Sequence, residues 1–287
     1  MSDEKSDENA VHNTTFAAQY RCLAGITDLF AKSLIDLSGI ASSSLEPLVV
    51  FDNACGTGSV SSILYQTLDR AQTRDWQLTC GDMAQAMLSY TEQRVKDEGW
   101  PNTTTKIVDA QNTGLASAHY THVFTAFAFN LFPDPAAALR ECFRVLQPQG
   151  TLGISVWTQN NWFDLVRSAI VRLPGNLPYP TQEEINAMYN RGWDLPDSVR
   201  AYLDKGGFHD VNVHTVKKRM SMSLDGVVEA CLMPAPFILD RFWTQEQRDQ
   251  YAGLVPGAIR SHVEEVFGKD GLGYLEADAL IAVAKKG

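Results

Sequence analysis

Val50-Phe51-Asp52-Asn53-Ala54-Cys55-Gly56-Thr57-Gly58 is the stretch that decides the fold of this chain. It continues a short apolar run that begins at Leu48, and helical spacing of apolar residues resumes from Ser59 to Leu68. This order predicts a strand, a tight turn and a helix. Glycines in such a turn let a ligand approach backbone N–H groups at the helix N-terminus, where the helix dipole favours a negative group.

Other interpretations of the same turn stay open at this point. A phosphate-binding loop of the P-loop type requires Gly-Lys-Ser or Gly-Lys-Thr, which this stretch does not contain. A dinucleotide fingerprint requires Gly or Ala three residues after Gly56, where Ser59 stands. A bare structural turn is the remaining alternative.

Outward from the turn, short apolar β-type runs alternate with helical patterns, which predicts an α/β fold with a mostly parallel sheet covered by helices. Seven strands are expected, at 48–51, 76–80, 105–108, 121–127, 151–157, 211–215 and 276–284. Helices are expected at 16–37, 59–68, 83–95, from Pro135 to a stop at Pro148, 162–173, from a capping box at 181–184, 199–203, and across 224–267 with a second capping box at 244–247. The second half of the chain therefore adds a helical cap to the sheet.

Composition excludes several classes of function. The 287 residues carry a net charge of -10, which argues against a nucleic acid partner. The longest apolar runs, such as 277–284, fall far short of the roughly 18 residues of a membrane span. The acidic start at 1–9 is unlike a signal or transit peptide, so we expect a disordered tail and a cytoplasmic protein.

The cysteines and histidines show no metal-binding spacing. The five cysteines are scattered and form no CxxC pair, so we expect reduced and mostly buried thiols, at Cys22, Cys55, Cys80, Cys142 and Cys231. The six histidines contain no HExxH spacing. No metal site is predicted.

The acidic strand end at Asp52 followed by Ala54-x-Gly56-x-Gly58 resembles motif I of the class I S-adenosylmethionine-dependent methyltransferases. Segments 120–134 and 138–157 look like motif IV of that family and the segment after it. The resemblance covers residues 46–158. It departs from the family at Gln149-Gly150, where two glycines are usual, and in the long spacer 66–75 before the second strand.

This resemblance implies a Rossmann-like, seven-stranded class I methyltransferase fold with an N-terminal helix and a helical cap. The expected divisions are a tail and helix at 1–45, a cofactor-binding core at 46–158, and a cap at 159–287 that is interleaved with the last two strands. The implied cofactor is S-adenosyl-L-methionine, and the implied product is S-adenosyl-L-homocysteine.

Residues at successive strand ends are the candidate cofactor ligands. Asp82 directly follows the second strand, where a carboxylate can accept both ribose hydroxyls, and Met83 can lie against the adenine face. The resemblance places Asp109 on the adenine amino group and the N–H of Ala110 on a ring nitrogen. Each aspartate could instead be a solvated loop residue or a helix cap. The full predicted set is Tyr20, Asp52, Ala54, Cys55, Gly56, Gly58, Asp82, Met83, Asp109, Ala110 and Phe127.

Aromatic residues beside strand ends and on the cap are the candidate substrate contacts, because aromatic faces can stabilise a sulfonium and close a site. The predicted set is Phe16, Phe129, Phe132, Trp157, Trp162 and Phe163, although any of them could serve only as core. A more specific likeness extends into the cap. It is to the fungal bis-thiomethyltransferases that methylate gliotoxin and other epidithiodiketopiperazines, and it rests on residues 78–82, 96–100, 118–124, 174–178 and 229–233.

The likeness implies S-methylation of a thiol in a small natural product, with no obligate protein partner. A thiol needs less activation than a phenol or an amine, and no dedicated base is evident, since His119 and His122 look like strand histidines. The alternatives are O- or N-methylation of a secondary metabolite, a cyclase or pericyclase on the same fold, and a non-catalytic cofactor-binding regulator. Accumulation of S-adenosylhomocysteine distinguishes the methyltransferases from the cyclase, whereas the regulator predicts a stable protein partner and no acceptor pocket.

Overall fold

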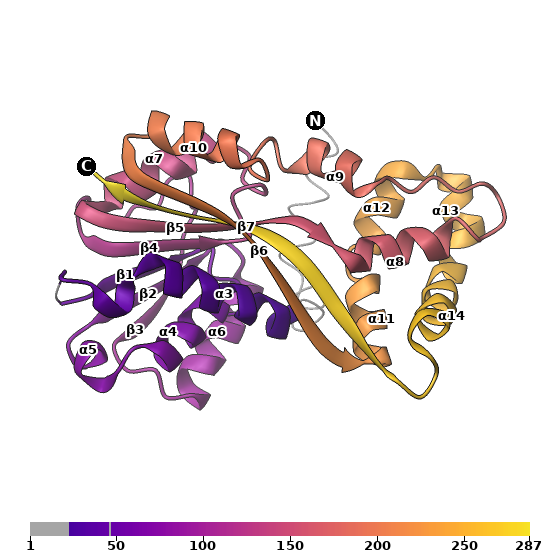
Figure 1. Cartoon of the computed structure of the whole chain (residues 1–287), viewed down its shortest axis with the longest axis horizontal. Helices are drawn as coiled ribbons and strands as arrows, with labels where there is room; N and C mark the ends of the chain where they lie inside the picture. The colour runs from indigo at the N-terminus through magenta and orange to yellow at the C-terminus, as the bar shows by residue number, and fades with distance from the viewer. Residues whose placement is uncertain (1–22, 46) are drawn as a thin grey trace. The chain divides into compact units, whose positions relative to one another are not determined.

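The computed structural model describes residues 23–45 and 47–287. Its seven-stranded sheet has the order β3-β2-β1-β4-β5-β7-β6 (Figure 1). The strands are β1 (Val49–Asn53), β2 (Gln77–Asp82), β3 (Thr103–Ile107), β4 (Tyr120–Ala126), β5 (Leu146–Asn160), β6 (Phe208–Ser223) and β7 (Leu272–Lys286). The seven predicted strands are confirmed.

Strands β1 to β5 pair in parallel, and β1 lies between β2 and β4. Asp52 of β1 is level with Cys80 on one side and Phe124 on the other. Figure 1 draws β7 opposite in direction to β5 and β6. The carboxyl ends of β1, β2 and β4 meet at one edge of the sheet, here called the carboxyl edge, and ligands bind there in open parallel sheets.

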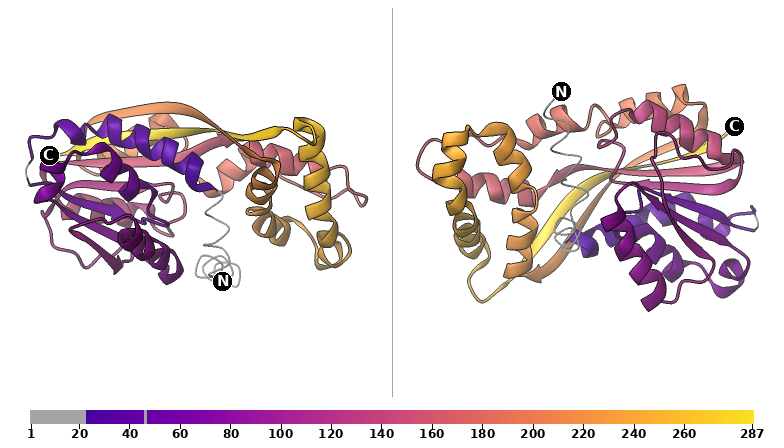
Figure 2. Two further views of the ribbon diagram at one scale, coloured as in Figure 1. Left: turned by 90° about the horizontal axis from the view of Figure 1, so that it is seen from below. Right: turned by 180° about the vertical axis from the view of Figure 1, so that it is seen from behind.

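Helices cover both faces of this sheet. The helices of the first half are α3 (Ala24–Ser38), α4 (Ser59–Thr67), α5 (Arg70–Arg74), α6 (Gln85–Asp97) and α7 (Pro135–Val145). Buried residues of α3, α4 and α6 share one apolar core, whereas α7 and α10 (Pro196–Lys205) contribute to a second core. Figure 2 gives two further views of the helices against the sheet. This two-sided burial explains why β1 and β4 consist of almost continuous buried residues.

The remaining helices belong to the second half of the chain: α8 (Asn161–Ile170), α9 (Gln182–Tyr189), α11 (Leu224–Leu232), α12 (Ala235–Phe242), α13 (Gln245–Tyr251) and α14 (Val255–Phe267). Both predicted capping boxes are present. Thr181 exchanges hydrogen bonds with Glu184, and Thr244 does so with Gln247. Within the described residues, no helix combines the length and apolar character needed to cross a membrane.

The chain forms two compact units. One contains Thr27–Trp157, Tyr189–Val216 and Ala279–Gly287, and the other contains the described residues 23–26 together with Thr158–Met188 and Lys217–Asp278. Strands β5, β6 and β7 each run from one unit into the other. The predicted divisions at 1–45, 46–158 and 159–287 stay a prediction.

One local expectation was wrong, and one short helix was missed. The helix that begins at Pro135 ends at Val145, before Pro148, and β5 already starts at Leu146. The register between β4 and β5 shifts between Tyr120 and His122, and Gln149 takes a positive φ of 63°, so the proline falls in an irregular part of the strand where a missing N–H is tolerated. Helix α5 was not predicted, and Asp69 begins it through a capping box with Gln72.

Candidate functional site

The turn after β1 is left-handed at three positions. Ala54, Gly56 and Gly58 have φ values of 55°, 55° and 80°. Thr91 of α6 fixes the turn by donating from Oγ1 to the Gly56 carbonyl at 2.9 Å. A Cβ on Gly56 would meet no atom within 4 Å, whereas one on Gly58 would lie 3.1 Å from Thr91 Oγ1. Gly56 therefore presents an open backbone, and Gly58 is required for packing.

Asp82 joins the end of β2 to this turn. Its Oδ2 accepts the Gly56 N–H at 2.9 Å, and its Oδ1 accepts the Ala84 N–H at 2.9 Å. A carboxylate has about four acceptor positions, so two backbone bonds are compatible with a ribose diol on the same oxygens. Met83, next in the chain, is 49% exposed and leaves an apolar side chain at the carboxyl edge.

Glycine at position 81 is required by packing. A Cβ there would lie 2.7 Å from Cε2 of Phe51 and 3.1 Å from Cγ2 of Val108, both in buried side chains. Because Gly81 has no side chain, β2 can pass close to the Phe51 ring of β1 just before Asp82. The sequence contains no signal for this contact, because the three residues lie on three different segments.

Asp52 has a structural role in the described fold. It is 1% exposed, and its Oδ2 accepts both the backbone N–H of Ser61 at 3.1 Å and the Ser61 hydroxyl at 2.6 Å. Burial raises the pKa of Asp52 to about 7. These bonds tie the end of β1 to the first turn of α4, and a direct cofactor contact of Asp52 stays a prediction.

Asp109 and Ala110 follow β3 by two and three residues. The N–H of Val108 donates to the Asp82 carbonyl at 3.0 Å, which places this chain segment beside the end of β2. Asp109 is exposed and Ala110 is buried. The Asp109 Oδ1 accepts the Gln111 N–H at 2.8 Å, so a turn already orients the carboxylate.

An aromatic cluster is formed by Phe127, which follows β4, Trp157 within β5, and Phe30 of α3. Phe127 has a positive φ of 57°, and its N–H donates to the Ser155 carbonyl at 2.7 Å. Its ring stacks on Trp157 with centroids 3.8 Å apart, and Phe30 packs edge-on against both rings at 5.8 and 5.2 Å. Phe30 was predicted only as an apolar residue of the N-terminal helix, and its place in this cluster was missed.

The other predicted aromatic residues lie elsewhere. Phe129 and Phe132 are buried in the core, where Phe129 packs on Trp193 with centroids 4.4 Å apart. Trp162 is buried and Phe163 half-buried on α8, in the other compact unit. Phe16 and Tyr20 lie outside the described residues. The substrate contacts of all six predicted aromatic residues stay predictions.

The two histidines near β4 are far from the carboxyl edge in the strand register. His122 is level with Val50 and Thr151 in the middle of the sheet, and its Nδ1 lies 3.0 Å from Thr121 Oγ1. Burial lowers the pKa of His122 to about 3, so the ring is neutral at physiological pH. His119 precedes β4 at its amino end. Among residues 23–45 and 47–287, no group of His, Cys, Asp and Glu could hold a metal ion.

Comparison with known proteins shows the family to which this chain belongs. A family model described as a methyltransferase domain matches residues 50–150. The chain is 50% identical to methyltransferase tpcH of Aspergillus fumigatus over 97% of this chain and 99% of that protein. The chain belongs to the class I S-adenosylmethionine-dependent methyltransferases.

This methyltransferase is also similar to a fungal thiomethyltransferase in sequence and to two solved structures in fold. It is 40% identical to the acetylaranotin bis-thiomethyltransferase of Aspergillus terreus over 94% of each chain. The fold is similar to that of YcgJ from Bacillus subtilis, with a TM-score of 0.53 at 14% identity over 90% of this chain and 98% of that one. It is also similar to phosphoethanolamine N-methyltransferase 2 of Haemonchus contortus solved with S-adenosyl-L-methionine, with a TM-score of 0.51 at 14% identity over 88% of this chain and 52% of that one.

The cofactor of this methyltransferase is S-adenosyl-L-methionine. The carboxyl edge fits that molecule, because the backbone of Gly56 faces open space and the adjacent Asp82 carboxylate is oriented by two N–H groups. Sequence reasoning missed the residues that support this arrangement, such as Ser61, Thr91 and Arg94, which donates to the Thr57 carbonyl at 3.1 Å. Their spacing along the chain contains no signal, since each acts on a distant segment.

Proposed function

We propose that this enzyme transfers the methyl group of S-adenosylmethionine to a thiol of a small natural product, with a dithiol such as an epidithiodiketopiperazine as the favoured acceptor. The observation that carries the proposal is the likeness to a protein named acetylaranotin bis-thiomethyltransferase, which extends over 94% of the chain. That likeness includes the helical cap as well as the cofactor-binding core.

The residues of the carboxyl edge would orient the cofactor. Asp82 would accept the ribose hydroxyls, Met83 would cover one face of the adenine, and the open backbone at Gly56 would admit the amino-acid end. When bound, S-adenosylmethionine supplies an electrophilic methyl group on a sulfonium. The protein then has to align donor and acceptor and exclude water, which are the dominant contributions to such a transfer.

The aromatic cluster of Phe30, Phe127 and Trp157 suits this task. The three rings pack with centroids 3.8 to 5.8 Å apart, and those of Phe30 and Phe127 are buried. Aromatic faces attract a cation, and an apolar lining favours an apolar acceptor. We assign to this cluster the role of shielding the reacting atoms from water.

A thiol acceptor agrees with the state of the histidines. His122 is buried and neutral, with a pKa of about 3, and His119 lies at the amino end of β4. A thiol has an ordinary pKa near 8.5, so a few per cent is already thiolate at pH 7 and reacts without a protein base. A phenol with a pKa near 10 would depend more on such a base.

The test is a panel of dithiol, phenol and amine natural products incubated with labelled S-adenosylmethionine, with products identified by mass spectrometry. The proposal requires label on sulfur and one equivalent of S-adenosylhomocysteine for each methyl group transferred. Label only on oxygen or nitrogen would replace the thiol assignment. Conversion of a substrate without S-adenosylhomocysteine would instead indicate cyclase chemistry.

A further inference from the structure

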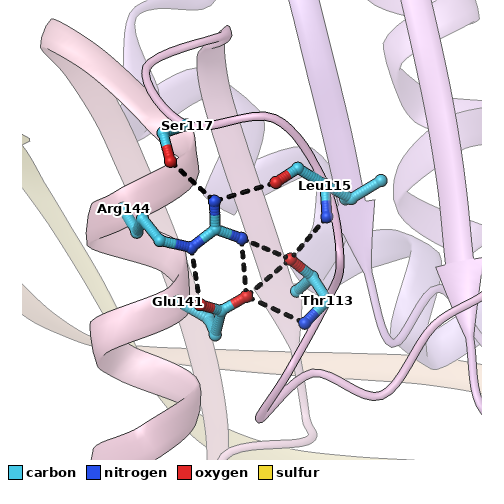
Figure 3. Close-up of polar contacts among 5 residues, drawn as sticks. All are labelled: Thr113, Leu115, Ser117, Glu141 and Arg144. Carbon is cyan, nitrogen blue, oxygen red and sulfur yellow. Dashed lines mark hydrogen bonds and ion pairs between the residues drawn. The ribbon is translucent and has the colours of Figure 1, made fainter.

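The loop that connects β3 to β4 is held against α7 by a network of side chains. Figure 3 shows Thr113, Leu115 and Ser117 of the loop facing Glu141 and Arg144 of the helix. All five residues belong to the same compact unit. The loop also contains Asp109 and Ala110, the predicted adenine contacts, so its placement bears on cofactor recognition.

Glu141 and Arg144 form a bidentate pair at the centre of this network. Arg144 donates from Nε to Oε1 at 2.7 Å and from Nη2 to Oε2 at 2.8 Å. Thr113 donates to Oε2 from its backbone N–H at 2.8 Å and from its hydroxyl at 2.6 Å. The hydrogen bonds from Arg144 and Thr113 lower the pKa of Glu141 to about 2, so the carboxylate stays charged throughout the neutral range.

Arg144 extends the network along the loop. Its Nη1 donates to the Leu115 carbonyl at 2.8 Å and to the Ser117 hydroxyl at 2.8 Å, and its Nη2 reaches Thr113 Oγ1 at 3.1 Å. The Leu115 N–H donates to Thr113 Oγ1 at 3.2 Å. Only a planar guanidinium can make these bonds together, because a lysine ammonium has neither the fork nor the five donors.

A second link ties the other end of the loop to the start of α7. Gln111 donates from Nε2 to Asp109 Oδ1 at 3.2 Å, and its Oε1 accepts the backbone N–H of Asp134 at 2.6 Å. Asp134 is the residue that caps α7, through a bond from the Ala137 N–H at 2.9 Å. The Asp109 carboxylate therefore lies on a loop that is hydrogen-bonded both to the N-terminus of α7 and to the side chains of Glu141 and Arg144.

We propose that Thr113, Glu141 and Arg144 are positioning residues that fix the loop so that Asp109 and Ala110 distinguish adenine from other purines. The inference rests on the proposed function and on the adenine contacts that the family resemblance implies for Asp109 and Ala110. A carboxylate on the exocyclic amino group reads adenine only if it is held in place, because a mobile aspartate would adapt to another base at little cost.

The experiment compares two ligands by calorimetry, S-adenosyl-L-homocysteine and S-inosyl-L-homocysteine, whose base has a carbonyl oxygen in place of the exocyclic amino group and a hydrogen on the adjacent ring nitrogen. The unaltered enzyme should prefer the adenosyl compound by about tenfold or more, the value of one hydrogen bond to a charged group. Thr113→Val removes the hydroxyl at nearly constant volume and should reduce this ratio to about threefold or less. Thr113→Ser keeps the hydroxyl and should retain the original ratio.

A second variant of the network and a matched control test whether the change in the affinity ratio is specific to these hydrogen bonds. Arg144→Lys tests the same network with the charge kept, and it should lower the ratio as Thr113→Val does. Thr73→Val is the matched control, because the Thr73 hydroxyl of α5 donates locally, to the carbonyl of the N-cap residue Asp69 at 2.9 Å. Melting temperatures confirm that each variant is folded.

Two results would overturn the inference. One is an unchanged ratio in both Thr113→Val and Arg144→Lys. The other is an unchanged ratio in Asp109→Ala, which would remove Asp109 from adenine recognition. Neither result depends on the acceptor, so failure of thiol methylation in the product panel would reject the proposed function separately.

Discussion

Asp52 and Asp82 end neighbouring strands but have different surroundings. Asp82 is oriented by the N–H groups of Gly56 and Ala84 beside an open backbone, whereas Asp52 is closed off by Ser61. Both carboxylates are typical of the family motif as a sequence pattern. Both side chains are buried in the folded chain, and the difference between them lies in their hydrogen-bond partners.

Two glycines of the site should respond differently to alanine. At Gly56 the added methyl group has open space but a φ of 55°, which costs about 1–2 kcal/mol of stability, and it would occupy space that we assign to the cofactor. At Gly81 the methyl group would lie 2.7 Å from the Phe51 ring, so overpacking should cost about 1–3 kcal/mol. Calorimetry should show a large loss of S-adenosylhomocysteine affinity for Gly56→Ala.

Full affinity in Gly56→Ala would contradict the placement of the cofactor over this turn.

Asp52 should make stability depend on pH. Its pKa is about 7 in the folded protein against an ordinary value of 3.8, so between these values the unfolded state releases a proton that the folded state keeps. The free energy of unfolding should therefore fall as the pH rises from about 4 to 7, by up to about 1.4 kcal/mol per pH unit from this group.

The measurement is urea unfolding of the unaltered enzyme and of Asp52→Asn at several values between pH 4.5 and 7.5. The variant cannot ionise, so the unaltered enzyme should lose stability relative to it as the pH rises. Parallel pH profiles for the two proteins would contradict the raised pKa.

Among the elements, α8 carries two predicted substrate contacts, Trp162 and Phe163. Asn160 begins this helix by accepting the Phe163 N–H at 3.0 Å. Asn160→Ala should cost about 1 kcal/mol of stability through loss of the cap, and it should raise KM for the acceptor while the affinity for S-adenosylhomocysteine is unchanged. Thr244→Ala removes an equivalent cap from α13 and serves as the control, since it should lower stability without changing either ligand. An unchanged acceptor KM in Asn160→Ala would separate α8 from substrate binding.

The elements that were predicted well are those with strong local periodicity. Signals within a few consecutive residues predicted three of them: strand β1, the helix that starts at Ser59, and the capping box at Thr244. Pro148 was misjudged because a proline breaks a helix in isolation, whereas here the chain had already entered β5 at an irregular register. Strand pairing, which is not local, decided that boundary.

In the whole molecule, β5, β6 and β7 pass through both compact units without a break. We expect both units to unfold in one transition, which S-adenosylhomocysteine should stabilise by about 2.7 kcal/mol at a concentration of 100 Kd. Asp82→Ala should weaken binding by about 1–3 kcal/mol and leave only about 0.3–1.8 kcal/mol of this stabilisation at the same concentration. Thermal unfolding followed by circular dichroism and by tryptophan fluorescence tests both points, with the exposed Asp75→Ala as control. Equal stabilisation of Asp82→Ala and the unaltered enzyme would exclude Asp82 from the site.

The sequence by itself determined the alternation of strands and helices, the glycine turn at Gly56 and the acidic residue at the end of β2, because each is written in a few consecutive residues. Only the tertiary structure decided what these groups contact. The Asp82 bond to Gly56 spans 26 residues, and the Glu141 bond to Thr113 spans 28. Burial, orientation and pKa depend on such distant partners, and local periodicity carries no information about which distant segments will meet.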